Sequence, residues 1–200
     1  MRQAYATYPG TRREIRRFVR QSIGPALGWR RRYPIDPNGL RERMTVPPET
    51  DGRPGYEVAV PGPGCRIGPL DPYGNRDATV PLKGGAVIII KSLGAVGAVP
   101  GGEATLDAAG RADEMRAQAP ASWIWLGPAE QVETGAGTGW RITATLEGAR
   151  TMFADTHIDR DGWAYVVGAI APPSRHADVA RVADAMLDTW CWVDPLVSTD

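Results

Sequence analysis

The last seventy residues of the chain alternate apolar and polar side chains, first with the period of β-strands and then with that of an α-helix. Segment 140–147 has an apolar residue at every second position, and segments 151–158 and 163–170 are similar in length and composition. Asp161-Gly162, between the latter two, is a dipeptide that tight hairpin turns favour. Segment 174–190 then carries apolar residues at helical spacing. This order predicts an antiparallel sheet covered by a C-terminal amphipathic helix.

The preceding part of the chain predicts further strands and one more helix. Strands are expected at 40–46, 56–60, 122–126 and 130–133. Segment 85–93 is apolar on both faces and is expected to be a central strand, whereas proline and glycine leave 56–60 as the only expected strand between residues 52 and 80. A helix over 106–119 has a weak apolar face and is expected on the surface, and Thr105 and Ser174 are the expected N-caps of the two helices. The chain is therefore expected to be α+β, with an antiparallel β-sheet and helices packed on it.

Charge divides the chain into a basic N-terminal extension and an acidic remainder. The first 33 residues hold nine arginines and one acidic residue, Glu14, whereas the rest hold 14 basic and 22 acidic residues. Thr11 and Glu14 have the spacing of a capping box, and Gly24-Pro25 would end the helix that the box starts. We expect residues 1–39 to form a basic extension with a short amphipathic helix, and residues 40–200 to form the α+β domain.

One face of the expected N-terminal helix is apolar, which favours a role in docking. A solvated tail would not need a capped apolar stripe, and a nucleic-acid arm would need more aromatic side chains among its arginines. The docking surface, whether a partner protein, a membrane or another copy of the chain, stays open. Trp123 and Trp125 share one face of a strand, which is either buried between layers or exposed as an apolar patch. The expected partner-binding residues are Ile15, Phe18, Val19, Ile23, Arg12, Arg16, Trp123 and Trp125.

Three segments carry a family pattern: GWRITATLEG at 139–148, DGWAYVVGAIAPP at 161–173 and MLDTW at 186–190. They resemble the C-terminal half of the PsbP-like superfamily, which includes the actinobacterial LpqN lipoproteins and the Eag chaperones of type VI secretion effectors. The resemblance covers roughly residues 40–193. It implies a PsbP-like sandwich that holds a protein partner on a sheet face or edge and has no shared catalytic residues. The chain departs from the LpqN branch in lacking a lipobox cysteine, and the basic extension lies outside the family pattern.

The titratable residues form no complete catalytic or metal-binding set in the sequence. Asp155 and His157 would share one face of a strand next to Asp159, but a divalent metal would need further ligands from elsewhere. The favoured alternative is a solvent-facing strand end that leads into a hairpin turn, and His176 is expected to be exposed in the first turn of the last helix. The glycine-rich stretches do not match the phosphate-binding patterns. We expect no catalytic residues, no metal and no cofactor.

The cysteines and the N-terminus predict a cytoplasmic location. Cys65 and Cys191 are outside metal-ligand spacing and are expected to be free thiols, although an exported chain would allow a disulfide. The first ten residues lack a secretory apolar core, and no apolar run is long enough to span a membrane. We therefore expect a non-enzymatic adaptor or chaperone that binds a protein partner within a secretion or phage-tail-like assembly. The alternative is a protein that associates with nucleic acid, the less favoured partner, or with a membrane surface through its arginine-rich arm.

Overall fold

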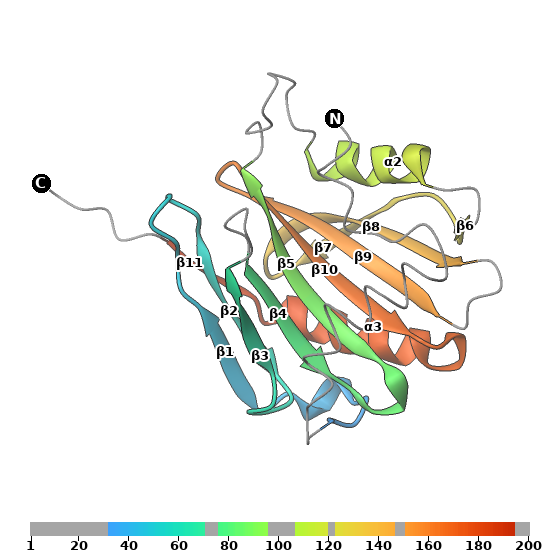
Figure 1. Ribbon diagram of the computed structural model, residues 1–200, viewed down its shortest axis with the longest axis horizontal. Helices are drawn as coiled ribbons and strands as arrows, with labels where there is room; N and C mark the ends of the chain where they lie inside the picture. The colour runs from blue at the N-terminus through green and yellow to red at the C-terminus, as the bar shows by residue number, and fades with distance from the viewer. Residues whose placement is uncertain (1–31, 71–75, 96–106, 120–122, 147–150, 195–200) are drawn as a thin grey trace, which may run out of the picture.

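The computed structural model describes residues 32–70, 76–95, 107–119, 123–146 and 151–194, which form two antiparallel sheets and two helices (Figure 1). The expected extension helix, with its six predicted partner-binding residues, lies outside the described residues. The strands are β1 (Glu42–Val46), β2 (Gly55–Val60), β3 (Arg66–Leu70), β4 (Arg76–Pro81), β5 (Val87–Ala95), β6 (Trp123–Trp125), β7 (Glu130–Thr134), β8 (Gly137–Leu146), β9 (Met152–Arg160), β10 (Trp163–Ala171) and β11 (Cys191–Val193). The helices are α2 (Ala108–Gln118), α3 (Pro173–Asp188) and the short 3-10 turns η3 (Pro37–Gly39) and η4 (Lys83–Gly85).

The larger sheet contains eight strands in the order β3-β4-β5-β10-β9-β8-β6, and β7 pairs with the first part of β8. The smaller sheet has the order β1-β2-β11. All of these strand pairs are antiparallel, and β5 lies inside the larger sheet as expected. The turn between β9 and β10 has positive φ at Asp161 and Gly162, as its sequence predicts. The described residues therefore form an α+β fold rich in antiparallel sheet.

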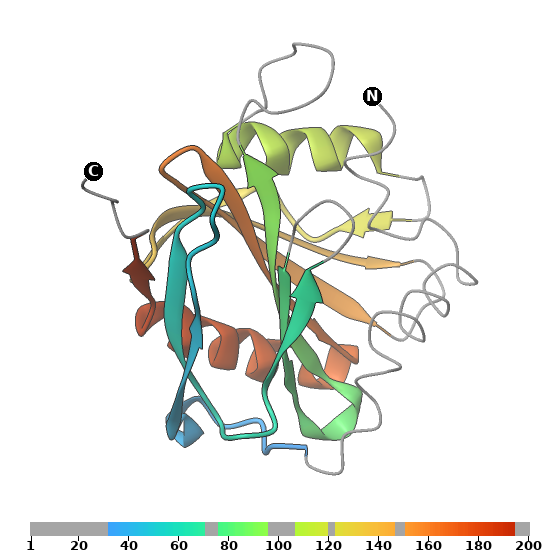
Figure 2. The same ribbon diagram turned by 60° about the vertical axis from the view of Figure 1, so that its left-hand side comes forward.

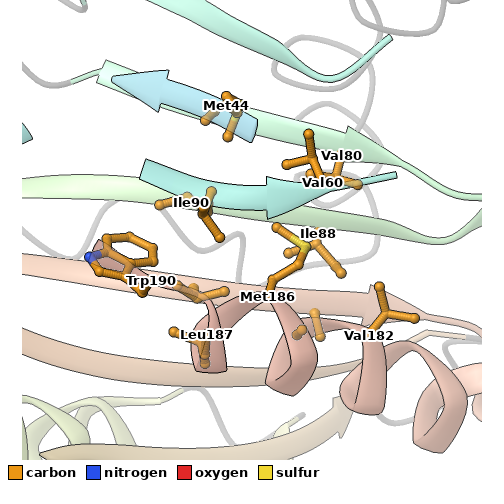
Figure 3. Packing of buried hydrophobic residues seen from close by; sticks show 14 of the residues in the cluster. Met44, Val60, Val80, Ile88, Ile90, Val182, Met186, Leu187 and Trp190 are labelled. Atoms are coloured by element: carbon orange, nitrogen blue, oxygen red, sulfur yellow. The ribbon is translucent and has the colours of Figure 1, made fainter. Parts of the chain in front are cut away.

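One face of the larger sheet packs against α3 and the smaller sheet, and this layer holds the main core (Figure 3). Val182 and Met186 of α3 belong to one apolar cluster with Ile88 and Ile90 of β5 and with strands β1 and β2. The expected apolar stripe of the last helix is confirmed, because its buried residues are the ones that face the sheet. The C-terminal helix thus joins the two sheets.

The opposite face of the larger sheet carries α2, which packs on β8 and β9 (Figures 1 and 2). Ala112 and Met115 of α2 pack on a second apolar cluster that includes Ile142 and Phe153. The outer side of α2 is exposed to solvent, which agrees with its weak apolar face.

In the part of the chain that the structure describes, no helix is long and apolar enough to cross a membrane.

Three strands were not expected from the sequence. The expectation of a single strand between residues 52 and 80 is wrong, because β3 and β4 extend the large sheet beyond β5. The last helix ends at Asp188, where the Thr189 hydroxyl donates to Met186 O and accepts from the Ala59 N–H. The following residues form β11 beside β2, so Cys191 is exposed on a strand rather than packed at a helix end.

The helix caps also differ from those expected. Asp107 caps α2, because its carboxylate accepts from the Gly110 N–H at 2.8 Å. Helix α3 begins at Pro173, so Ser174 lies inside the first turn. A proline at this position has no N–H to leave unpaired and has a φ that suits a helix start, which replaces a side-chain cap.

Candidate functional site

Three polar residues of β9 face α2 and form a cluster on that side of the sheet. Asp155, His157 and Asp159 share this face, and Arg111 of α2 donates a hydrogen bond to Asp159. A Cβ atom at Gly168 would lie 2.7 Å from Asp155 Oδ1, so this carboxylate sits over the neighbouring strand β10. The expectation of a solvent-facing strand end is wrong for Asp155 and His157, because both are buried.

Asp159 fastens the start of α2 to the sheet. Its Oδ2 accepts from the Ala108 N–H at 2.8 Å, and its Oδ1 accepts from Arg111 Nη2 at 2.5 Å. A carboxylate at a helix N-terminus satisfies a free N–H group and interacts well with the helix dipole. The buried Arg111 guanidinium gains a charged partner at the same point. This geometry gives Asp159 a structural role.

Asp159→Asn should lower the free energy of unfolding by about 1 kcal/mol, because an amide keeps the shape of the carboxylate but not its charge. Urea unfolding followed by far-UV circular dichroism would measure this loss. Asp161→Asn is the matched control, since Asp161 lies in the exposed turn of the same hairpin. Equal stabilities for the two variants would contradict the fastening role.

His157 is a buried histidine with no hydrogen-bond partner for either ring nitrogen among the described residues. Its side chain lies between Trp140 of β8 and Val166 of β10 in the sheet register, and the residue is only 3% exposed. Burial and the positive charge of Arg111 lower the pKa of His157 to about 3. The imidazole is therefore neutral at pH 7, and a base of such low pKa is poorly matched to proton transfer at neutral pH.

The other titratable residues of interest are held apart from this cluster. His176 is buried in the first turn of α3, so its expected exposure is wrong, and burial together with Arg141 lowers its pKa. Burial raises the pKa of Cys65 to about 11, and Cys65 and Cys191 are both free thiols. Among the described residues, no three His, Cys, Asp or Glu side chains gather as a metal site would require.

A second polar contact joins the two sheets. Arg53, which precedes β2, donates from Nη1 to Ser92 Oγ of β5 at 2.8 Å and pairs with Asp51. Its guanidinium carbon lies 4.7 Å from the centre of the Trp163 ring, and the Tyr165 hydroxyl donates to Pro54 O. A small pocket here is lined by Arg53, Ser92 and Tyr165, together with Tyr56 of β2. The arginine is thus occupied in holding the smaller sheet against the larger one.

Strand β6 ends the large sheet on the side opposite β3, so its outer edge pairs with no other described strand. The Leu126 N–H donates to Thr143 O at 2.9 Å, and the register places Ile124 opposite Thr145. In antiparallel geometry, Trp123 and Trp125 then point their backbone N–H and C=O groups away from β8. The edge therefore presents backbone groups of the kind that an added strand would use.

The two predicted tryptophans lie on the α2 side of β6. Trp123 is buried against Phe153, with ring centres 4.7 Å apart, and Trp125 is half-buried beside it. The Arg116 guanidinium lies 5.7 Å from the Trp125 ring and also donates to Gly127 O. Trp123 is thus a core residue, whereas part of Trp125 faces solvent.

The side chains on the other face of this edge were not among the predicted partner-binding residues. Ile124 is 46% exposed and Leu126 is 48% exposed, and they are the large hydrophobic residues that the structure leaves open to solvent in its described part. The pattern of strand 122–126 showed that it was apolar on both faces, but it could not show which face the protein covers. We call Ile124, Trp125 and Leu126 the β6 edge.

The comparisons with known proteins leave the family open. No family model matches the chain, and no curated protein matches it. Among solved structures, the chain is similar to LpqN, described as involved in cell envelope biogenesis of Mycobacterium tuberculosis. The match has 13% identity and a TM-score of 0.34, and it covers 78% of this chain and 82% of that one. A TM-score this low carries no argument about fold or function, so the PsbP-like resemblance stays a prediction.

Proposed function

We propose that this protein is a non-catalytic adaptor or chaperone that binds an extended segment of a partner protein along the β6 edge. The observation that carries the proposal is the exposure of Ile124, on the terminal strand of the large sheet, and of Leu126, directly after it. Added strands bind through backbone hydrogen bonds, and side chains on alternate positions supply specificity. The cytoplasmic location and the role within a secretion or phage-tail-like assembly stay predictions.

The neighbouring strand shows how the same edge is protected elsewhere. β6 and β7 pair with different parts of the same hydrogen-bonding edge of β8. The exposed residues of β7 are Glu130, Gln131 and Glu133. Charged side chains and prolines protect sheet edges from unwanted pairing, and Pro128 lies between the two strands. The β6 edge has apolar side chains in place of this protection. A partner that covers them explains why they are apolar.

Lysine at both exposed positions should abolish partner binding. Full-length Ile124→Lys/Leu126→Lys protein, immobilised and exposed to native lysate, should retain the wild-type partner at least about tenfold less, because the charges would be buried in the complex. Gln131→Lys/Thr138→Lys is the matched control, since it adds the same charge at exposed positions of β7 and β8.

Quantitative mass spectrometry of the retained proteins decides the outcome. A protein held by the wild type and the control but lost from the edge variant supports the proposal. Equal recovery by all three proteins would refute it, and so would the absence of any protein held specifically by the wild type. Circular dichroism spectra that match the wild type would show that the edge variant is folded.

A further inference from the structure

Part of the α2 side of the large sheet is covered by neither described helix. Val87 and Ile89 of β5 and Ile170 of β10 form a small apolar cluster there. Helix α2 packs on β8 and β9, and α3 packs on the opposite face of the sheet. We call Val87, Ile89 and Ile170 the β5–β10 patch.

The β5–β10 patch is nevertheless buried. Val87 is 4% exposed and Ile89 is 6% exposed. On an open sheet face such side chains would keep much of their outer surface in water. Neither described helix accounts for this burial, because α2 packs on β8 and β9 and α3 packs on the opposite face.

The chain enters the described structure next to this patch. The Tyr33 N–H donates to Pro81 O at 3.0 Å, and the Lys83 N–H donates to Tyr33 O at 2.8 Å. Pro81 pairs with Val87, and Val87 pairs with Ile170, so the start of the described chain lies one strand away from the patch. The first 31 residues are thus tethered beside it, which gives them a high effective concentration there.

The N-terminal extension has the right length and composition for this cover. A helix over residues 11–23 would be about 20 Å long, whereas the nine residues of β5 span about 30 Å. The eight residues from 24 to 31 can reach up to about 26 Å, enough to place such a helix anywhere along the patch. Its apolar stripe consists of Ile15, Phe18, Val19 and Ile23.

We propose that residues 11–23 of the same chain lie on the β5–β10 patch with this apolar stripe toward the sheet. The arginines of the helix then flank the contact, and they complement a remainder of the chain with eight more acidic than basic residues. Asp155 and Lys91 also lie on this sheet face, so it carries charges of both signs. This contact is separate from the β6 edge and does not depend on the proposed function.

Disulfide trapping in the full-length protein tests the contact. In a background with Cys65→Ser and Cys191→Ser, the pair Phe18→Cys and Ile89→Cys should form an intramolecular disulfide on mild oxidation. Arg20→Cys with Ile89→Cys is one matched control, because position 20 lies on the opposite side of the helix from position 18. Phe18→Cys with Ile88→Cys is the other, because Ile88 faces the α3 side of the same strand.

Peptide mapping under non-reducing conditions separates the outcomes. A disulfide within one chain in the Phe18–Ile89 pair, and in neither control, supports the proposal. A disulfide between chains in that pair would show that a second copy supplies the cover and would overturn the same-chain contact. No disulfide in that pair would show that another part of the chain covers the patch, which also overturns it.

A second measurement applies if the paired variants prove difficult to fold. Ile89→Cys alone, in the same background, should react slowly with a maleimide. Adding Phe18→Asp should speed this labelling by about 10- to 100-fold, the factor expected from losing the burial of one phenylalanine side chain. Adding Arg20→Asp should have little effect, and equal rates for Phe18→Asp and Arg20→Asp would overturn the proposal.

Discussion

Trp190→Ala should lower the free energy of unfolding by about 3–5 kcal/mol, which is a large part of the stability of a typical domain. The Trp190 ring is buried just after α3 and stacks on Tyr56 of β2 with ring centres 4.2 Å apart. Its ring centre also lies 5.2 Å from the ring centre of Trp192 of β11. The same indole therefore holds the end of the helix and two strands of the smaller sheet, and alanine would leave a cavity between them.

Trp190→Phe is the control that separates packing from the indole nitrogen. Nε1 of Trp190 is buried without a hydrogen-bond partner in the described part of the chain, so phenylalanine removes an unsatisfied donor while it keeps an aromatic ring. We expect this variant to lose less than about 1.5 kcal/mol. Urea unfolding monitored by circular dichroism measures both variants. A loss below about 1 kcal/mol for Trp190→Ala would contradict the packing described here.

Acid should destabilise the protein through His157. In the unfolded chain this imidazole binds a proton as the pH falls through about 6.5, whereas burial holds the folded pKa at about 3. Between these two values the unfolded state binds more protons, so stability that is present at neutral pH is lost as the pH falls. For this residue the loss between pH 7 and pH 5 is about 2 kcal/mol.

His157→Leu isolates that contribution from the other titrating groups, which include His176 and the carboxylates. Leucine has a similar volume and no polar atoms, so the variant should be at least as stable as the wild type at pH 7. Its advantage should grow by about 2 kcal/mol between pH 7 and pH 5, as measured by urea unfolding at each pH. A constant difference between the two proteins would mean that the folded histidine titrates normally.

The parts of the fold that the sequence predicts well are those in which local pattern and final packing agree. Strands β8, β9 and β10 and helix α3 have clear periods, and the turn at Asp161-Gly162 has the residues that its backbone requires. Strands β3 and β4 contain proline and glycine, and they become strands because β5 supplies a partner for β4. Pairing of this kind between distant segments has no local signal.

The site was harder to predict because burial depends on what covers a face. The sequence predicts that Asp155 and His157 share one face of their strand. They are buried only because this strand lies between β8 and β10 and under α2. The same reason explains the β6 edge. Trp123 and Ile124 are adjacent in the sequence and both are apolar. Only the placement of α2 decides that Trp123 is covered and Ile124 is exposed.

Site-specific photo-crosslinking tests the central claim, partner binding at the β6 edge, most directly. Full-length protein with p-benzoylphenylalanine at position 126, irradiated in its native cells, should form a covalent adduct with one partner protein. The same crosslinker at position 138, exposed on β8, should not form that adduct. An adduct at position 126 alone is the predicted result, and no adduct there, or the same adduct at both positions, would contradict it.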